Sequence, residues 1–285
     1  MTGPYRTPAQ RIGRTLLIVY CTLVFAFLVL PTLAVIPISL NPSSFLVFPT
    51  EGLSLRWYRD LFDSPEWLRA LRNSLAVATV TTILATALGT PAAIGLARMR
   101  SRAKPWLVGL FAAPMVVPVV VIAIAFYFLF APMGLVNGFA GIVIAHTVLA
   151  IPFVVIVVHA SLAGFDFELL RAASSLGARP VTVFFRVLAP LIGPGIAAGA
   201  VFAFMTSFDE TVVALFLAGP DQRTVPLQMW EGVREQISPT ITAAATLLVI
   251  TSTLLLGTAE LLRRRSERMN TKASFEKVGP DSSQK

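Results

Sequence analysis

The sequence predicts an all-α membrane protein with six transmembrane helices, and three observations lead to this prediction. First, the 285 residues are 55% hydrophobic and only 13% charged, whereas soluble domains carry about 25% charged residues. Second, six apolar runs are each long enough to cross a bilayer. Third, the basic residues concentrate in alternate connecting segments.

The six apolar runs define a transmembrane domain that covers residues 16–262. A helix needs about 20 apolar residues to cross the hydrocarbon core. The runs that meet this length are 16–38, 74–97, 106–130, 139–162, 195–217 and 241–262. They must be helical because backbone polar groups do not go unpaired in lipid. The first run is too long for a signal-peptide core and shows no clear cleavage site, so we expect it to be retained.

The distribution of basic residues predicts that both termini are cytoplasmic. With this orientation, 17 of the 23 lysine and arginine residues lie in cytoplasmic segments, where such an excess is typical. The segments 1–15 and 263–285 are then cytoplasmic, and the polar composition of the basic tail 263–285 predicts disorder. The net charge of +8 reflects this topology, and we expect no nucleic-acid partner.

Two outer segments are predicted as surface helices, residues 55–68 and residues 226–237. The first interleaves aromatic and charged side chains, which suits a helix among lipid headgroups. Ser238 and Pro239 follow the second and suit an N-cap and first turn for the sixth transmembrane helix.

Proline and small residues predict the shape and packing of the transmembrane helices. Pro114, Pro118 and Pro152 are expected to bend the third and fourth helices. Small residues that recur every four positions allow close helix approach, either within this chain or against a partner. They occur at positions 85, 89, 93 and 97 in the second helix and at 195, 199 and 203 in the fifth.

The longest connection, residues 163–190, joins the fourth and fifth transmembrane helices. Asp166 can cap a short helix there, and Gly177 can end it. An apolar face at helical spacing lies between them. It comprises Leu169, Ala172, Ala173 and Leu176. Such a face on the cytoplasmic side either docks a partner or folds back on the membrane surface, and the residues alone favour neither.

Asp209 and Glu210 are the only pair of ionisable residues deep in a span. Each would cost about 2.5–3.5 kcal/mol at a helix centre, which indicates a role. The nearby phenylalanines would let the carboxylates receive an ammonium group with cation–π support. The candidate residues of a substrate path are Asp209, Glu210, Thr206 and Phe208. The alternative is a structural pair, hydrogen-bonded within the bundle or capping a broken helix.

His146 and His159 lie 13 residues apart in the fourth helix, which places them about 220° apart around it. They cannot face one lumen together, so we expect a structural role for each rather than proton relay or metal binding. The lone Cys21 excludes an intrachain disulfide and a cysteine-cluster zinc site.

The long loop resembles the signature of binding-protein-dependent ABC importer permeases, in which Glu-Ala-Ala is followed at fixed spacing by Gly and a final Leu-Pro. The matching positions are Ala172, Ala173, Gly177, Val187 and Pro190. Arg171 replaces the usual Glu, and Ala189 replaces the Leu. Glu168, one turn earlier, is a candidate substitute for the missing acid.

This resemblance implies a type I importer permease (MetI-like) fold in the bacterial inner membrane. It also implies that the loop forms a coupling helix that sits in a groove of a cytoplasmic ATPase. The residues expected to take part are Glu168, Arg171, Ala172, Ala173, Leu176, Gly177 and Pro190.

Three further strings are similar to the polyamine (spermidine and putrescine) branch of this family, and most of all to its second permease subunit. They are residues 52–58, the pair Asn73-Ser74, and residues 207–220. The resemblance implies a small cationic solute, a periplasmic solute-binding protein, a second permease subunit that differs from this one, and an ATPase dimer. The chain has no phosphate-binding loop ending in Gly-Lys-Ser/Thr, so we expect it to bind no cofactor and the ATPase to bind the ATP.

The alternative function is a secondary, ion-coupled transporter of small solutes. That mechanism calls for inverted repeats and intramembrane charges in both halves, and the first half has no such charge. An intramembrane serine hydrolase would need a buried nucleophile near a histidine, and no Gly-x-Ser turn lies in a span. We therefore expect a permease subunit that is not an enzyme.

Overall fold

The computed structural model describes residues 8–44, 52–163, 165–235 and 238–277, and every regular element in these ranges is a helix. Five helices are long and apolar enough to cross a membrane, and a bent pair supplies a sixth if it forms one span. The predicted all-α membrane fold is confirmed. The chain forms two compact units, Met1–Ser64 with Gly232–Val249, and Pro65–Glu231 with Ile250–Lys285.

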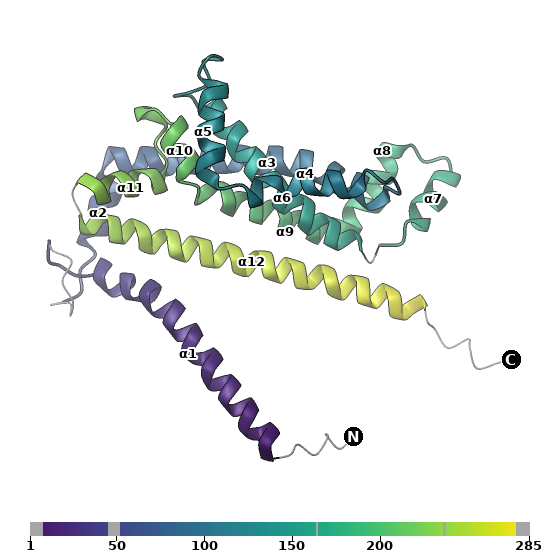
Figure 1. The fold of residues 1–285 in the computed structure, drawn as a ribbon, viewed down its shortest axis with the longest axis horizontal. Coiled ribbons are helices and arrows are strands. Elements are labelled where there is room, and N and C mark those ends of the chain that lie inside the picture. Colours follow the sequence, from purple (N-terminus) through teal and green to yellow (C-terminus); the bar gives the residue numbers. More distant parts are fainter. Residues whose placement is uncertain (1–7, 45–51, 164, 236–237, 278–285) are drawn as a thin grey trace. The chain divides into compact units, whose positions relative to one another are not determined.

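The helices follow one another along the chain as Figure 1 shows. They are α1 (Pro8–Ser39), α2 (Arg56–Asp63), α3 (Pro65–Arg98), α4 (Lys104–Val116), α5 (Val119–Phe130), α6 (Phe139–Leu162), α7 (Glu168–Ser175), α8 (Pro180–Val183), a π-helical turn (Phe184–Leu188), α9 (Ala189–Phe208), α10 (Val212–Leu217), a 3₁₀ turn (Pro220–Gln222), α11 (Val225–Glu235) and α12 (Pro239–Lys277).

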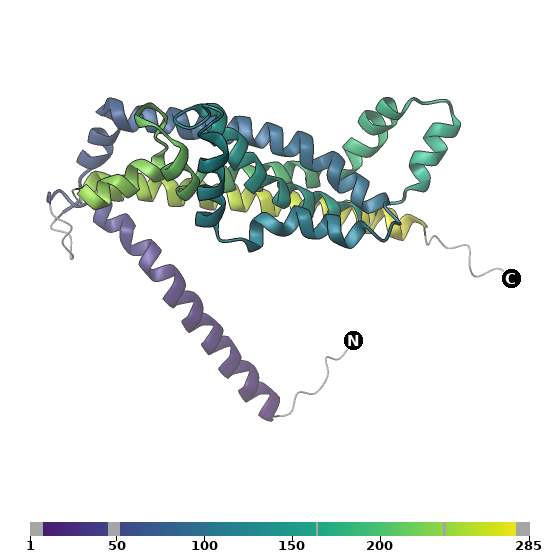
Figure 2. The same cartoon turned by 45° about the horizontal axis from the view of Figure 1, so that its top comes forward.

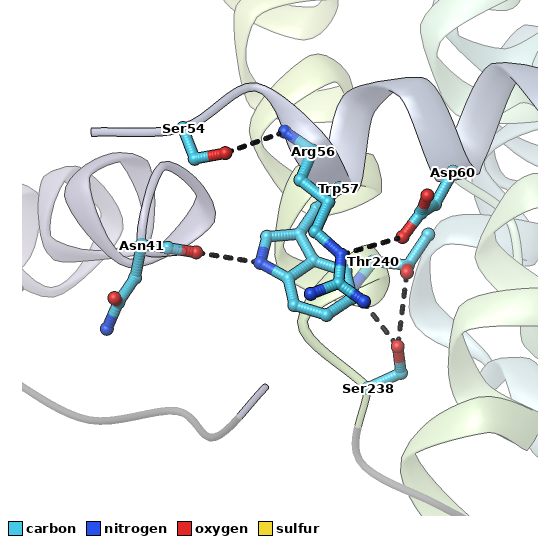
Figure 3. A network of polar contacts seen from close by, with 7 residues as sticks. All are labelled: Asn41, Ser54, Arg56, Trp57, Asp60, Ser238 and Thr240. Atoms are coloured by element: carbon cyan, nitrogen blue, oxygen red, sulfur yellow. Dashed lines mark hydrogen bonds and ion pairs between the residues drawn. The ribbon is translucent and has the colours of Figure 1, made fainter. Parts of the chain in front are cut away.

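In the first unit, α2 is fixed by its aromatic side chains. The indole Nε1 of Trp57 donates to the backbone oxygen of Asn41 over 2.7 Å, and Arg56 lies over the Trp57 ring (Figure 3). The hydroxyls of Ser39 and Tyr58 are 2.7 Å apart. The expected surface helix 55–68 thus differs in two ways: Trp57 is buried, and the helix stops before Pro65, which starts α3.

The two ends of α12 can be compared with what the sequence suggested. Ser238 Oγ accepts a hydrogen bond from the backbone N–H of Thr240, so the predicted N-cap is confirmed and Pro239 takes the first helical position. The helix then continues to Lys277, where disorder was expected from residue 263. The extension has a local cause, because residues 263–277 contain good helix formers and neither glycine nor proline.

In the second unit, α3, α6 and α9 pack against one another and form the centre of the bundle (Figures 1 and 2). The fully buried Val154 of α6 lies between Gly89 of α3 and Gly199 of α9. A Cβ atom at Gly89 would come within 2.9 Å of Val154, and one at Gly199 within 3.4 Å. The small-residue stripes of the second and fifth helices therefore pack inside this chain.

The third predicted span is not one helix, because α4 and α5 meet at an angle of 98°. Val117 is extended, with ψ of 132°, as expected for a residue before proline, and Pro118 precedes the first residue of α5. Pro114 and Pro152 lie inside α4 and α6 without interrupting them. Of the three prolines expected to bend helices, Pro118 is the one at which a helix breaks.

Candidate functional site

The fifth predicted span also breaks, and the break places Asp209 and Glu210 between two helices. The first helix, α9, ends at Phe208, and α10 begins at Val212. The fifth predicted span, residues 195–217, is therefore not one continuous helix. The two acids instead lie where backbone groups at helix ends lack partners within the helix.

Glu210 supplies the missing partners at the start of α10. Its Oε1 accepts from the N–H of Val212 over 3.0 Å, and its Oε2 accepts from the N–H groups of Val213 and Ala214 over 2.8 and 3.2 Å. A negative charge is also favourable at a helix N-terminus. Both carboxylate oxygens of Glu210 are thereby committed to capping, one of the alternatives left open by the sequence.

One polar side chain from another helix lies against Glu210. His146 of α6 is fully buried, and its Nδ1 shares a 2.9 Å hydrogen bond with Ser207 Oγ. This bond orients the ring so that Nε2 lies 3.6 Å from Oε2 of Glu210. The sequence predicted a structural role for His146 but no partner, because Glu210 is distant from it along the chain.

Asp209 has a different environment from its neighbour. It is exposed and makes no ion pair or side-chain hydrogen bond with the described residues. Its carboxylate is therefore available to a ligand, whereas that of Glu210 is occupied.

A pocket of about 460 Å³ opens at this break. Its lining combines the two carboxylates with hydroxyl, aromatic and aliphatic groups, from Phe202, Met205, Thr206, Asp209, Glu210, Thr211, Val212 and Ser252. Thr206 donates to the backbone oxygen of Phe202 over 2.9 Å. Of the four predicted substrate-path residues, three line this pocket. Phe208 does not, because it is buried and stacks on Phe204.

The long loop forms a short helix, α7, with a defined end. Asp166 Oδ1 accepts from the N–H of Glu168 over 2.9 Å at its start. Gly177 adopts φ of 82°, and its N–H donates to Ser174 while that of Ala178 donates to Ala173. These two bonds form the Schellman motif that ends a helix in a left-handed residue.

One face of α7 is buried against the rest of the chain, and the other is exposed. Leu170, which was not part of the predicted apolar face, is buried. Leu169 and Ala172 are exposed, and Leu176 is 89% exposed. Ala173 is half-buried. Apart from Ala173, the residues of the predicted apolar face are thus left exposed by the part of the chain that the structure describes.

Glu168 and Arg171, the two charged residues expected to take part in coupling, pair with each other. Arg171 donates to Glu168 over 2.6 Å, and both side chains are largely exposed. Pro190, which ends the loop motif, lies at the start of α9, directly after the π-helical turn. Proline has no N–H to donate and crowds the preceding turn, and a π-helical turn is one way in which a helix accommodates this. The chain from Pro180 to Phe208 therefore runs as one 29-residue helix.

The N-terminal part of α3 is bound to the segment that follows α10. The amide nitrogen of Asn73 donates to the backbone oxygens of Asp221 and Arg223 over 2.8 and 2.9 Å. Ser74 Oγ accepts from the N–H of Val225, and Arg69 pairs with Asp221. The sequence drew attention to Asn73-Ser74 through its resemblance alone and gave no sign of these partners.

This architecture, a helical bundle with a broken span and a helix exposed at the end of its longest loop, matches a known class. Residues 85–268 match the family of binding-protein-dependent transport system inner membrane components, and the chain belongs to that family. It is therefore a multi-pass permease of the inner membrane rather than an enzyme.

Individual relatives agree with this assignment. The chain is 34% identical over 260 residues to the spermidine/putrescine transport system permease protein PotC of Escherichia coli K12, covering 91% of this chain and 98% of the relative. It is 34% identical to the putrescine transport system permease protein PotI of the same strain, covering 81% and 85%.

A solved structure shares the fold at low sequence identity. A chain of a bacterial ABC transporter for the acidic polysaccharide alginate aligns with a TM-score of 0.69 at 15% identity, over 90% of this chain and 99% of that one. At this identity the likeness concerns the fold alone. The predicted importer permease fold is confirmed, and nothing in the comparisons supports a secondary transporter.

Proposed function

We propose that this chain is the permease subunit of an ABC importer for a small cationic solute, a polyamine such as spermidine or putrescine. The uncommitted carboxylate of Asp209 in the pocket at the helix break is the observation that carries this proposal. An ammonium group in this pocket would pair with Asp209 and lie near the aromatic face of Phe202. The names of the relatives PotC and PotI point to the same class of solute.

The pocket supplies one free carboxylate, whereas a polyamine carries at least two ammonium groups. Glu210 is already bound to three backbone N–H groups and lies close to His146. We therefore assign the second ammonium group to an acidic residue of a different permease subunit, which encloses the path together with this chain. A periplasmic binding protein would deliver the solute from outside.

The proposed energy source is a cytoplasmic ATPase dimer, which binds ATP and holds the coupling loop 163–190. The exposed face of Leu169, Ala172 and Leu176 supports this placement, because large apolar side chains on a surface helix mark a contact site. Binding of the ATPase at this loop requires the loop and both termini to lie in the cytoplasm. The distribution of basic residues agrees with this orientation.

The test is uptake of radiolabelled putrescine into proteoliposomes that contain the complete transporter, with the binding protein outside and ATP inside. We expect uptake that requires both proteins and ATP, and that other polyamines inhibit by competition. Uptake that persists without ATP and follows a proton gradient would contradict the proposal. A neutral or anionic solute transported in place of polyamines would contradict the choice of solute alone.

A further inference from the structure

A small pocket beside α7 is lined by three arginine side chains and by no acidic residue. Its volume is about 260 Å³, and it is bounded by Ala97, Arg98, Arg100, Phe167 and Arg171. The arginines come from three elements: the end of α3, the loop that follows it, and α7. Separate parts of the chain thus bring three like charges to one place.

These charges are only partly neutralised within the chain. Arg171 pairs with Glu168, and both side chains are exposed, at 70% and 68%. Neither Arg98 nor Arg100 forms an ion pair with an acidic residue in the described ranges. Like charges held together repel, so this arrangement is stabilised by an anionic group from outside.

An apolar groove adjoins the arginine pocket and shares two of its residues. The groove has a volume of about 460 Å³, and Arg98 and Arg171 contribute to its wall together with apolar side chains. These are Ile94, Leu170, Pro180, Val183, Phe184 and Leu188. A partner that fits both sites combines an apolar side chain with a nearby carboxylate.

We propose that the arginine pocket receives a carboxylate of the ATPase subunit, so that the coupling surface of this permease is basic and that of its ATPase is acidic. This inference rests on the proposed function.

The competing occupant is the phosphate of an anionic lipid. Two features favour a protein carboxylate. The helix that carries Arg171 projects with α8 beyond the ends of α3 and α6 (Figure 2), and the same helix presents the exposed Leu176. A lipid headgroup would occupy the pocket but leave this apolar side chain in water.

The test measures binding of the cognate ATPase to the permease pair in nanodiscs of neutral phospholipid, at low and moderate salt. We expect Arg98→Gln, Arg100→Gln and Arg171→Gln each to weaken binding about tenfold and to reduce its salt dependence, because each removes a partly desolvated charge pair. Arg→Lys at the same positions should retain most of the affinity. The matched control is Arg102→Gln, in the same loop but outside both pockets.

The outcomes separate this inference from the function on which it rests. If the ATPase binds equally well to the wild type and the three glutamine variants, or if Arg102→Gln weakens binding as much as they do, the pocket is not the docking site. If the variants differ from the wild type only in discs with anionic lipid, the pocket holds a headgroup and the inference fails. If the ATPase does not bind the wild-type permease at all, the proposed function fails as well.

Discussion

The imidazole Nε2 of His146 lies 3.6 Å from Oε2 of Glu210, and this contact joins α6 to the break between α9 and α10. Because Ser207 fixes the other ring nitrogen, the histidine cannot turn away without losing a buried hydrogen bond. Glu210 is thereby enclosed between an imidazole and three backbone N–H groups. The two adjacent acids thus have different roles, and they can be separated experimentally.

We predict that Glu210→Ala lowers the stability of the permease by about 1–2 kcal/mol, because an N-cap interaction of this size is lost. Thermal unfolding of the purified transporter measures this. Glu210→Gln should be milder, since the amide oxygen can still accept from one or two of the N–H groups. An alanine variant as stable as the wild type would show that α10 does not depend on the cap.

For Asp209→Asn we expect normal membrane abundance and melting temperature, because its side chain has no hydrogen-bond or ion-pair partner among the described residues to lose. Putrescine uptake should fall about 10- to 100-fold, in line with the loss of a charge-assisted hydrogen bond of about 1.5–3 kcal/mol. Uptake in proteoliposomes, normalised to transporter content, is the measurement. Unchanged uptake would remove Asp209 from the substrate path.

Gly195→Ala should destabilise the packing of α9 on α6 by about 1–3 kcal/mol through overpacking. The added Cβ would overlap the Oγ atom of Ser161 and lie 2.6 Å from its Cβ. Gly193→Ala is the matched control, because nothing lies within 4 Å of its Cβ position. Melting temperatures that fall equally for both variants would contradict the close approach.

A side chain at Gly177 would strain the backbone without clashing with neighbouring residues, since the space around its Cβ position is open. Gly177→Ala places an alanine at φ of 82°, which costs about 1–2 kcal/mol. We expect α7 to lose its defined end and ATP hydrolysis to become less dependent on the solute-loaded binding protein. Gly177→Asn should retain more coupling, because asparagine tolerates this conformation better. Wild-type coupling in the alanine variant would contradict this prediction.

Asn73 uses both amide hydrogens on backbone carbonyls of the segment after α10. Asn73→Ala should cost about 1–3 kcal/mol for acceptors left without a donor, and Asn73→Asp should cost more, because a carboxylate repels both oxygens. Arg69→Gln is the control. It removes an exposed ion pair to Asp221, and such pairs contribute about 0–1 kcal/mol. If Asn73→Ala and Asn73→Asp do not lower the melting temperature more than Arg69→Gln does, Asn73 does not bind this segment to α3.

The sequence predicted the features that depend on composition and local pattern. The boundaries of α6, the N-cap at Ser238 and the helix that ends at Gly177 all follow from residues close together in the chain. The breaks near Pro118 and Asp209 were harder to predict, because whether a proline or an acid interrupts a helix depends on what its freed backbone groups meet. Contacts such as His146 with Glu210 and Asn73 with Arg223 join distant segments, and one sequence does not show them.

The uninterrupted helix from Pro180 to Phe208 begins beside the arginine pocket and ends at the acid-lined break. At about 1.5 Å per residue, it is a rod about 43 Å long. A tilt of about 10° at one end of such a rod moves the other end by about 7 Å, more than the width of an ammonium group. A small rocking movement imposed at the end near α7 would therefore open or close the pocket beside Asp209 directly, without a series of intermediate side chains.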